Sequence, residues 1–222
     1  MTPPDIADNF RLLINHSAFP CVGAKSALAR GTLDILVARD LCSNWDDRRI
    51  YDGITRIVQA YRADRALFQS FAVIFEGPVD LDEKRFEKFL WARAESLTNK
   101  DTWLGAPRDA RVSSDPEDPH FSLSFGEEAF FIVGLHPRAS RPARRFERPV
   151  LVFNLHDQFE QLREQGRYER MREKIIERDV ALAGSPNPML ARHGSISEAR
   201  QYSGRNVAEP QWRCPFNPVA RT

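Results

Sequence analysis

The sequence has few cysteines and no long apolar run. Cys21, Cys42 and Cys214 are its only three cysteines, and such an odd, widely spaced set does not form a disulfide framework. No stretch reaches the roughly 20 apolar residues that a membrane-spanning helix needs. The first residues lack the basic start and apolar core of a secretory signal peptide. We therefore expect a protein of the reducing cytoplasm without a membrane partner.

The motifs of several enzyme classes are missing as well. There is no HExxH, CxxC or GxGxxG pattern, no serine or cysteine in a nucleophile elbow, and no flavin or nicotinamide motif. The segment Gly23-Ala-Lys25-Ser26 lacks the first glycine and the Gly-Lys pair of a phosphate loop. A formal net charge of +1 gives no general reason to expect nucleic acid as a partner.

The residues that are present indicate an ordinary globular domain. Hydrophobic residues make up 42% and charged residues 28% of the 222 residues, so we expect residues 1–222 to form a single domain. Strand runs followed by helices favour an α+β fold with a largely antiparallel central sheet packed by helices. From Gly184 on, turn-forming residues predict an extended C-terminal arm anchored by Tyr202, Trp212 and Phe216.

Apolar spacing places the expected elements. Helices are predicted over Pro4–His16 and Asp46–Ala63, from a cap at Asp80, and, as two helices or one broken helix, after Asn154. The segment Phe19–Ser26 is expected to interrupt the helical start, and 99–119 reads as a long surface loop. The predicted strands are Thr32–Ala38, Phe71–Phe75, Phe121–Phe125, Ala129–Leu135 and Pro149–Leu155.

One histidine follows an apolar strand directly. His136 precedes Pro137, which favours extended geometry where the chain leaves the sheet. The buried strand holds the backbone of such a residue in place, while its side chain is accessible at the end of the sheet, as an axial metal ligand requires. A histidine that is hydrogen-bonded at a strand end explains the same pattern, and the residues alone favour that simpler reading.

A dense block of arginine follows His136. Such a block repels itself unless water or an anion neutralises it, and guanidinium groups suit carboxylates and phosphates. A haem edge, a phosphate, a nucleic-acid backbone and a solvated loop all remain open, although the absence of interleaved aromatic residues disfavours RNA. The five residues are Arg138, Arg141, Arg144, Arg145 and Arg148.

A second histidine ends the next apolar strand. His156 is expected in the first turn of a helix, where imidazole stays neutral and suits a metal as well as packing. If the two strands pair antiparallel, His136 and His156 lie about 17 Å apart, so a shared site is not expected. Cys21 and Cys214 each neighbour a proline and read first as structural thiols, with a ligand or nucleophile role left open.

Several long motifs resemble the YqcI/YcgG family over nearly the whole chain. They are Phe19-Pro-Cys-Val-Gly-Ala-Lys-Ser-Ala27, Gly134-Leu-His-Pro-Arg-Ala-Ser-Arg141 with Arg144-Arg-Phe146, Val152-Phe-Asn-Leu-His-Asp-Gln-Phe-Glu160, Asn187-Pro-Met-Leu190, Ser197-Glu-Ala-Arg-Gln-Tyr-Ser-Gly-Arg205 and Trp212-Arg-Cys-Pro-Phe216. The resemblance implies a haem-dependent monooxygenase that N-hydroxylates a small guanidine- or amine-containing compound such as arginine or a derivative.

The resemblance also implies a cofactor, partners and a residue set. Haem b is expected, with dioxygen, an external ferredoxin- or flavodoxin-type electron donor and no nucleic acid; formation of a homodimer stays open. Iron is assigned first to His136, then to His156, then to a cysteine thiolate. The full expected cofactor-binding set is His136, Arg138, Ser140, Arg141, Arg144, Arg145, His156, Cys21, Lys25 and Cys214.

Two other functions compete with this expectation. One is a haem-binding sensor or carrier that uses the same site without turnover. The other is an anion- or nucleic-acid-binding module built on the loop 138–148.

A cationic substrate of the expected monooxygenase would need a carboxylate partner, and the candidates are Glu127, Glu128, Asp157, Glu160 and Glu198.

Overall fold

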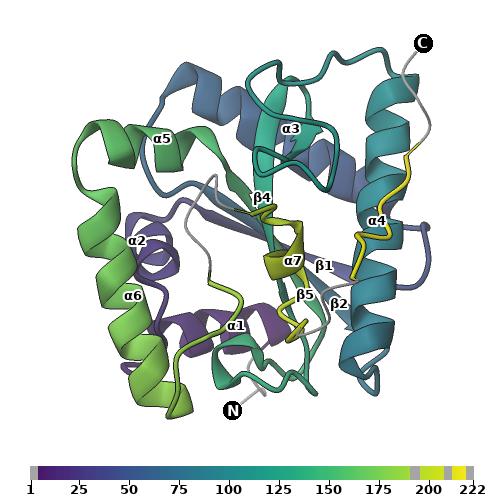
Figure 1. Ribbon diagram of the computed structural model, residues 1–222. Helices are drawn as coiled ribbons and strands as arrows, with labels where there is room; N and C mark the ends of the chain where they lie inside the picture. Colours follow the sequence, from purple (N-terminus) through teal and green to yellow (C-terminus); the bar gives the residue numbers. More distant parts are fainter. Residues whose placement is uncertain (1–4, 191–195, 208–211, 219–222) are drawn as a thin grey trace.

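The computed structural model describes residues 5–190, 196–207 and 212–218. Seven α-helices and one five-stranded sheet lie within these ranges (Figure 1). The elements are α1 (Ile6–Asn15), α2 (Val22–Arg30), β1 (Leu33–Asp40), α3 (Asp47–Ala63), β2 (Ser70–Gly77), α4 (Glu83–Trp103), β3 (Leu123–Phe125), β4 (Glu128–Leu135), the 3-10 helix η1 (Pro142–Arg144), β5 (Val150–Leu155), α5 (Asp157–Glu164), α6 (Tyr168–Ala183) and α7 (Ala199–Tyr202).

The sheet is mixed and mostly antiparallel. Its strand order is β1-β2-β5-β4-β3; β1 and β2 pair in parallel, and the other neighbours pair antiparallel. The predicted α+β class is therefore confirmed. Part of the predicted C-terminal arm lies outside the described residues. Its three expected anchors are all buried, and Tyr202 and Phe216 both pack on the ring of Trp91.

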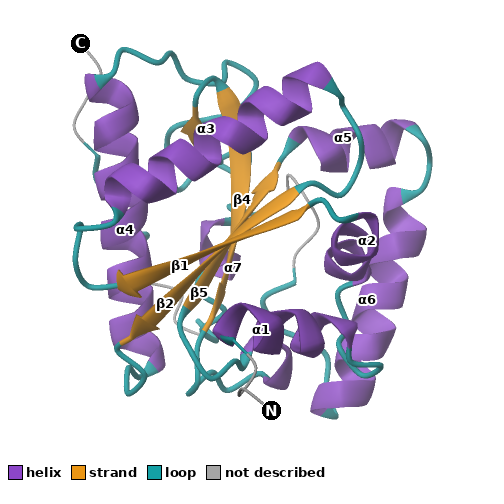
Figure 2. Ribbon diagram, turned by 180° about the vertical axis from the view of Figure 1, so that it is seen from behind, coloured by secondary structure: helices purple, strands orange, loops and turns teal. Residues whose placement is uncertain are grey.

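Each face of the sheet carries its own core. One face packs against α3 and α4, through residues such as Phe71, Phe153 and Leu90. The other face packs against α1, through Phe10 and Ile14. Figure 2 shows α3 and α4 on one side of the sheet and α1, α2 and α6 on the other. The alternation of side chains along each strand produces this division.

Helix α2 is a helix that the sequence pattern missed. The sequence predicts only an interruption of the helical start at Phe19–Ser26, because proline and glycine stand close together there. In the structure α2 begins directly after Cys21, whose Sγ accepts a hydrogen bond from the N–H of Ala24 at 3.4 Å. The thiol thus satisfies one of the free N–H groups at the helix start. Cysteine is not a usual cap residue, so the pattern gave no signal.

The ends of α4 also differ from the prediction. Its cap is Asp82, which accepts from the N–H of Arg85 at 2.8 Å, and not Asp80. At the other end the helix continues to Trp103 and so takes in the first residues of the predicted loop 99–119. Asp101 is fully buried in this last part and accepts from the hydroxyl of Tyr51 at 2.7 Å. A tertiary contact therefore extends the helix beyond its apolar periodicity.

No helix in the described part of the chain is both long enough and apolar enough to cross a membrane.

Candidate functional site

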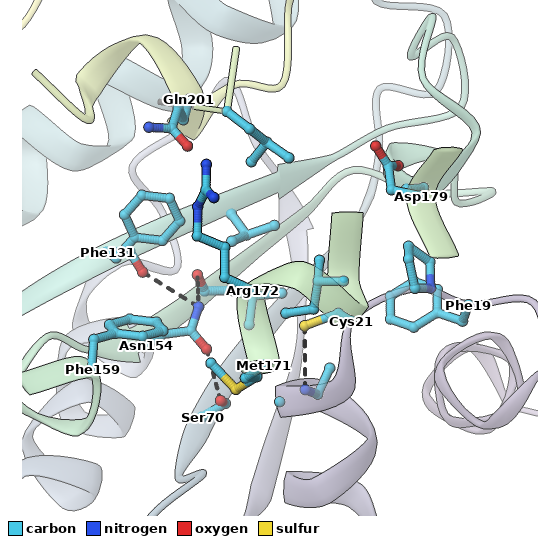
Figure 3. Close-up of a pocket in the computed structure, with 18 of the residues that line it drawn as sticks. Phe19, Cys21, Ser70, Phe131, Asn154, Phe159, Met171, Arg172, Asp179 and Gln201 are labelled. Atoms are coloured by element: carbon cyan, nitrogen blue, oxygen red, sulfur yellow. Dashed lines mark hydrogen bonds between the residues drawn. The ribbon is translucent and has the colours of Figure 1, made fainter. Parts of the chain in front are cut away.

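A cavity of about 300 Å³ lies between the sheet and the helices α1, α2 and α6. This volume is at the small end of the range for small-molecule sites. Figure 3 shows the lining side chains that converge on it. The floor comes from the strands, and its residues are Leu33, Ser70, Phe131, Val133, Leu135, Val152 and Asn154.

The pleat of β4 determines which of its residues reach the cavity. Phe131, Val133 and Leu135 line it, whereas Phe130 and Ile132 pack into the core beneath α3 and α4. Successive side chains of a strand point to opposite faces, so odd-numbered residues of β4 face the cavity and even-numbered ones face α4. The same rule brings Val152 and Asn154 of β5 to the cavity.

Cys21 is the thiol of the cavity. It stands at the N-terminus of α2, half-buried, and its Sγ accepts from the N–H of Ala24. Burial raises the pKa of the Cys21 thiol above its ordinary value, while the backbone N–H groups at the helix start act in the opposite direction. The side chain is thus a protonated thiol that a metal can deprotonate, with a donor already in place for the thiolate. Cys21 can therefore serve as a thiolate ligand of a metal ion.

A polar pair interrupts the apolar floor. The hydroxyl of Ser70 donates to Oδ1 of Asn154 at 2.8 Å, and Nδ2 of Asn154 lies 3.4 Å from the carbonyl oxygens of Phe131 and Val152 (Figure 3). These bonds fix the amide and leave the rest of the floor apolar. The walls add Phe159 and Leu162, together with Ile175 of α6. The cavity can therefore hold an apolar body against a few fixed polar groups.

The arginine loop is bound to the protein itself. Arg141 pairs with Asp179 and donates to the carbonyl of Ser185 at 2.8 Å. Arg144 donates to the carbonyls of Gly134, Tyr202 and Gln201, and burial lowers its pKa to about 10. Arg141 and Arg144 line the cavity, but their hydrogen-bonding groups point largely at protein acceptors.

The remaining loop residues lie away from the cavity. Arg145 donates to the carbonyls of Ala139 and Ser140. The hydroxyl of Ser140 donates to Oε1 of Glu83 at 2.7 Å. Arg138 is exposed, and none of these residues lines the cavity. The loop is therefore arranged chiefly as a support for the fold.

His136 faces α4, on the side of the sheet opposite the cavity. It is 1% exposed, and its ring stacks on Phe86 with centroids 4.3 Å apart. Its Nδ1 has no hydrogen-bond partner among the described residues. Burial lowers the pKa of His136, and the charge of Glu83 acts in the opposite direction. His136 does not line the cavity, which weakens its standing as the first choice for iron.

His156 lies at the other end of the β4–β5 pair, as the antiparallel pairing predicts. It is the residue directly before α5, where it forms no side-chain cap, and its Nδ1 lies 3.8 Å from Oε1 of Glu160. It does not line the cavity. The two histidines therefore belong to neither a shared site nor the cavity.

The last two members of the expected set serve other contacts. Nζ of Lys25 donates to the carbonyl of His16 at 2.6 Å and so holds the C-terminal end of α1. Cys214 packs at the edge of the core beneath α4, where burial raises its pKa to about 12. Of the ten expected residues, the cavity brings together Cys21, Arg141 and Arg144.

Several charged or polar residues of the cavity were not assigned to it from the sequence, and three of them matter for ligand binding. Arg172 and Gln201 line it, and neither side chain is hydrogen-bonded to any residue that the structure describes. Glu198 is the one member of the five candidate carboxylates that lines it. The sequence does hold a signal for Arg172. It lies on the same helical face as the apolar residues Tyr168, Met171 and Ile175, where a charged side chain is unusual.

The other candidate carboxylates lie in ion-pair networks. Glu127 and Glu128 pair with Arg62, Asp157 pairs with Arg111, and Glu160 pairs with Arg163. Within the described ranges, no group of three or more His, Cys, Asp or Glu side chains is arranged to hold a metal ion.

A comparison with protein families shows which family the chain belongs to. The model of the YqcI/YcgG family matches residues 10–217. The chain belongs to the YqcI/YcgG family. This match covers nearly the whole chain, as the motifs in the sequence led us to expect. No curated protein and no solved structure matches it.

Proposed function

We propose that this YqcI/YcgG protein is a haem-dependent monooxygenase that N-hydroxylates a small guanidine- or amine-containing compound. The observation that carries the proposal is the placement of Cys21, a thiol with a backbone donor, in the wall of a mostly apolar cavity. Thiolates are established axial ligands of haem iron. Membership of the family supports the same proposal.

The donor types and apolar walls of the cavity suit a haem, and because a haem is larger than the cavity of about 300 Å³, its binding would move parts of the wall apart. Cys21 is the leading iron ligand, because the N–H of Ala24 is directed at its sulfur and hydrogen bonds to the ligand are one way in which a protein tunes haem. Met171 and Tyr168 also line the cavity and offer a thioether and a phenol as second choices. The histidine assignments remain the competing hypothesis. When bound, haem supplies the activation of dioxygen.

The chain itself binds and orients the substrate. We assign the cationic nitrogen to Glu198, because a guanidinium or ammonium group favours a carboxylate and Glu198 is the member of the candidate set that lines the cavity. Phe131, Phe159 and Ile175 exclude water from the reacting groups, which strengthens that ion pair. An external ferredoxin- or flavodoxin-type protein would deliver the electrons.

A titration with haem tests the proposal. The wild-type protein should gain a Soret band, and Cys21→Ser should lose that band or shift it, whereas His136→Gln should leave it unchanged. The reverse pattern would return iron to His136. A protein that gains no Soret band with excess haem overturns the proposal. Oxygen uptake with a reductant and guanidine or amine compounds then separates an enzyme from a haem sensor.

A further inference from the structure

The cavity contains a cation that no residue in the described ranges pairs with. Arg172 of α6 lines the cavity and is half-buried. It forms no ion pair or hydrogen bond with any residue in the described ranges. The other three arginines of the lining are engaged: Arg141 by Asp179, Arg144 by three carbonyls and Arg163 by Glu160. A half-buried charge without a partner is costly, so this position invites an anionic ligand.

A second polar group stands beside it. Gln201 of α7 is 8% exposed and lines the cavity, and its side-chain amide has no partner among the described residues. Figure 3 shows the guanidinium of Arg172 extended toward this amide, next to the ring of Phe131. Two successive helices, α6 and α7, thus bring a charged donor and a neutral donor to one end of the cavity.

We propose that Arg172 and Gln201 form a carboxylate-binding site at the α6–α7 end of the cavity. A guanidinium group binds a carboxylate through two parallel hydrogen bonds, and the amide N–H adds a third donor. One uncompensated cation balances one negative charge, which favours a carboxylate over a phosphate dianion. Glu198 and Asp179 also line the cavity and add negative charge that a dianion would meet.

The carboxylate has two possible sources within the proposed function, on which this inference rests. It can be a propionate of the haem, since the arginines of loop 138–148 that line the cavity already bind protein acceptors. It can equally be the carboxylate of an amino-acid substrate whose cationic nitrogen pairs with Glu198. Both sources present the same group to Arg172, and matched ligand pairs tell them apart.

Two ligand pairs differ in the carboxylate. Haem is compared with its dimethyl ester by absorbance titration, and arginine is compared with agmatine, which is arginine without its carboxylate, by calorimetry. Arg172→Gln should weaken the binding of at least one of the two acids by about ten- to one-hundredfold. The dissociation constant of its carboxylate-free counterpart should change less than about twofold. The pair that responds identifies the source.

The controls use the same helix and the same site. Arg170→Gln removes an equal charge from an exposed position of α6 and should leave all four dissociation constants unchanged. Should Arg172→Gln fold poorly, Gln201→Glu replaces it, because a like charge beside the bound carboxylate should weaken the same acid. Unchanged binding of both acids, or an equal loss for acid and counterpart, overturns the carboxylate site. If no haem binds, the proposed function fails, and the arginine–agmatine pair still decides this site.

Discussion

The imidazole of His136 lies against the ring of Phe86, with the centroids 4.3 Å apart and the planes 19° from parallel. The contact places this histidine in the core beneath α4. A residue that the sequence marked for metal chemistry is therefore buried in this core, away from the cavity.

Acid should destabilise the fold through His136. Burial lowers the pKa of His136 in the folded protein, while the unfolded chain titrates near the ordinary value of about 6.5. Below about pH 6.5 the unfolded state therefore binds a proton at His136 that the folded state does not bind. The contribution of His136 to the free energy of unfolding is present in full above about pH 6.5 and declines below it. The free energy of unfolding should fall by up to about 1.4 kcal/mol per pH unit from this group.

Denaturant unfolding between pH 5 and 8 measures the effect. His136→Gln should lose this part of the pH dependence, so that its profile becomes flatter than the wild-type profile below pH 6.5. Parallel profiles for the two proteins would show that His136 does not titrate differently on unfolding.

Arg144 should matter more for stability than for haem binding. Replacing it with methionine leaves the carbonyls of Gly134, Tyr202 and Gln201 without their donor, and buried acceptors without partners are costly. Arg144→Met should lower the free energy of unfolding by about 2–4 kcal/mol. Arg138→Met, at an exposed position of the same loop, should change it by less than about 0.5 kcal/mol. Chemical denaturation compares the two, and equal effects would contradict the supporting role of Arg144.

Two helical glycines should respond differently to replacement by alanine. A Cβ at Gly53 of α3 would lie 2.3 Å from Cζ of Phe71, whereas a Cβ at Gly23 of α2 would meet nothing closer than 3.7 Å. Gly53→Ala should therefore destabilise the protein by about 1–3 kcal/mol through overpacking. Gly23→Ala should be neutral or stabilise by up to about 1 kcal/mol, because alanine favours the helix. Thermal unfolding of both variants checks the difference, and a stabilising Gly53→Ala would refute the packing described.

Bound haem should protect one thiol selectively. If Cys21 holds the iron, its sulfur is not available to an alkylating reagent, whereas the exposed Cys42 stays accessible. Haem should slow the alkylation of Cys21 by iodoacetamide at least about tenfold and leave the rate at Cys42 unchanged, since reaction requires a free thiolate. Peptide mass spectrometry measures both rates. Equal rates at Cys21 with and without haem would remove it as the ligand.

Local patterns account for much of the fold. The apolar runs at β2, β4 and β5 predict strands that the structure contains, and the spacing of Ile50, Ile54 and Ile57 predicts α3. The helix α2 escaped prediction because a thiol caps it. The end of α4 escaped because the buried Asp101 binds a distant tyrosine.

The candidate site depended on information that no local pattern holds. Alternation along β4 separates Phe131 and Val133 from Ile132, but it does not say which face of the sheet carries the cavity. That choice follows from the tertiary packing, in which α3 and α4 fill one side and α1, α2 and α6 enclose the cavity on the other. The arginine loop shows the same limit, because a cluster of charge does not reveal that its acceptors are mostly backbone carbonyls, with the carboxylate of Asp179 on Arg141.

The two faces of β4 place different demands on sequence change. The residues that face α4 hold the core together, and the alternate residues shape the cavity, so substitutions in the cavity row can alter ligand preference with little effect on the opposite core. Insertion or deletion of a single residue within the strand would exchange the two rows at once. Variation in ligand preference at β4 should therefore proceed by substitution at fixed strand length, while changes in length are confined to the loops.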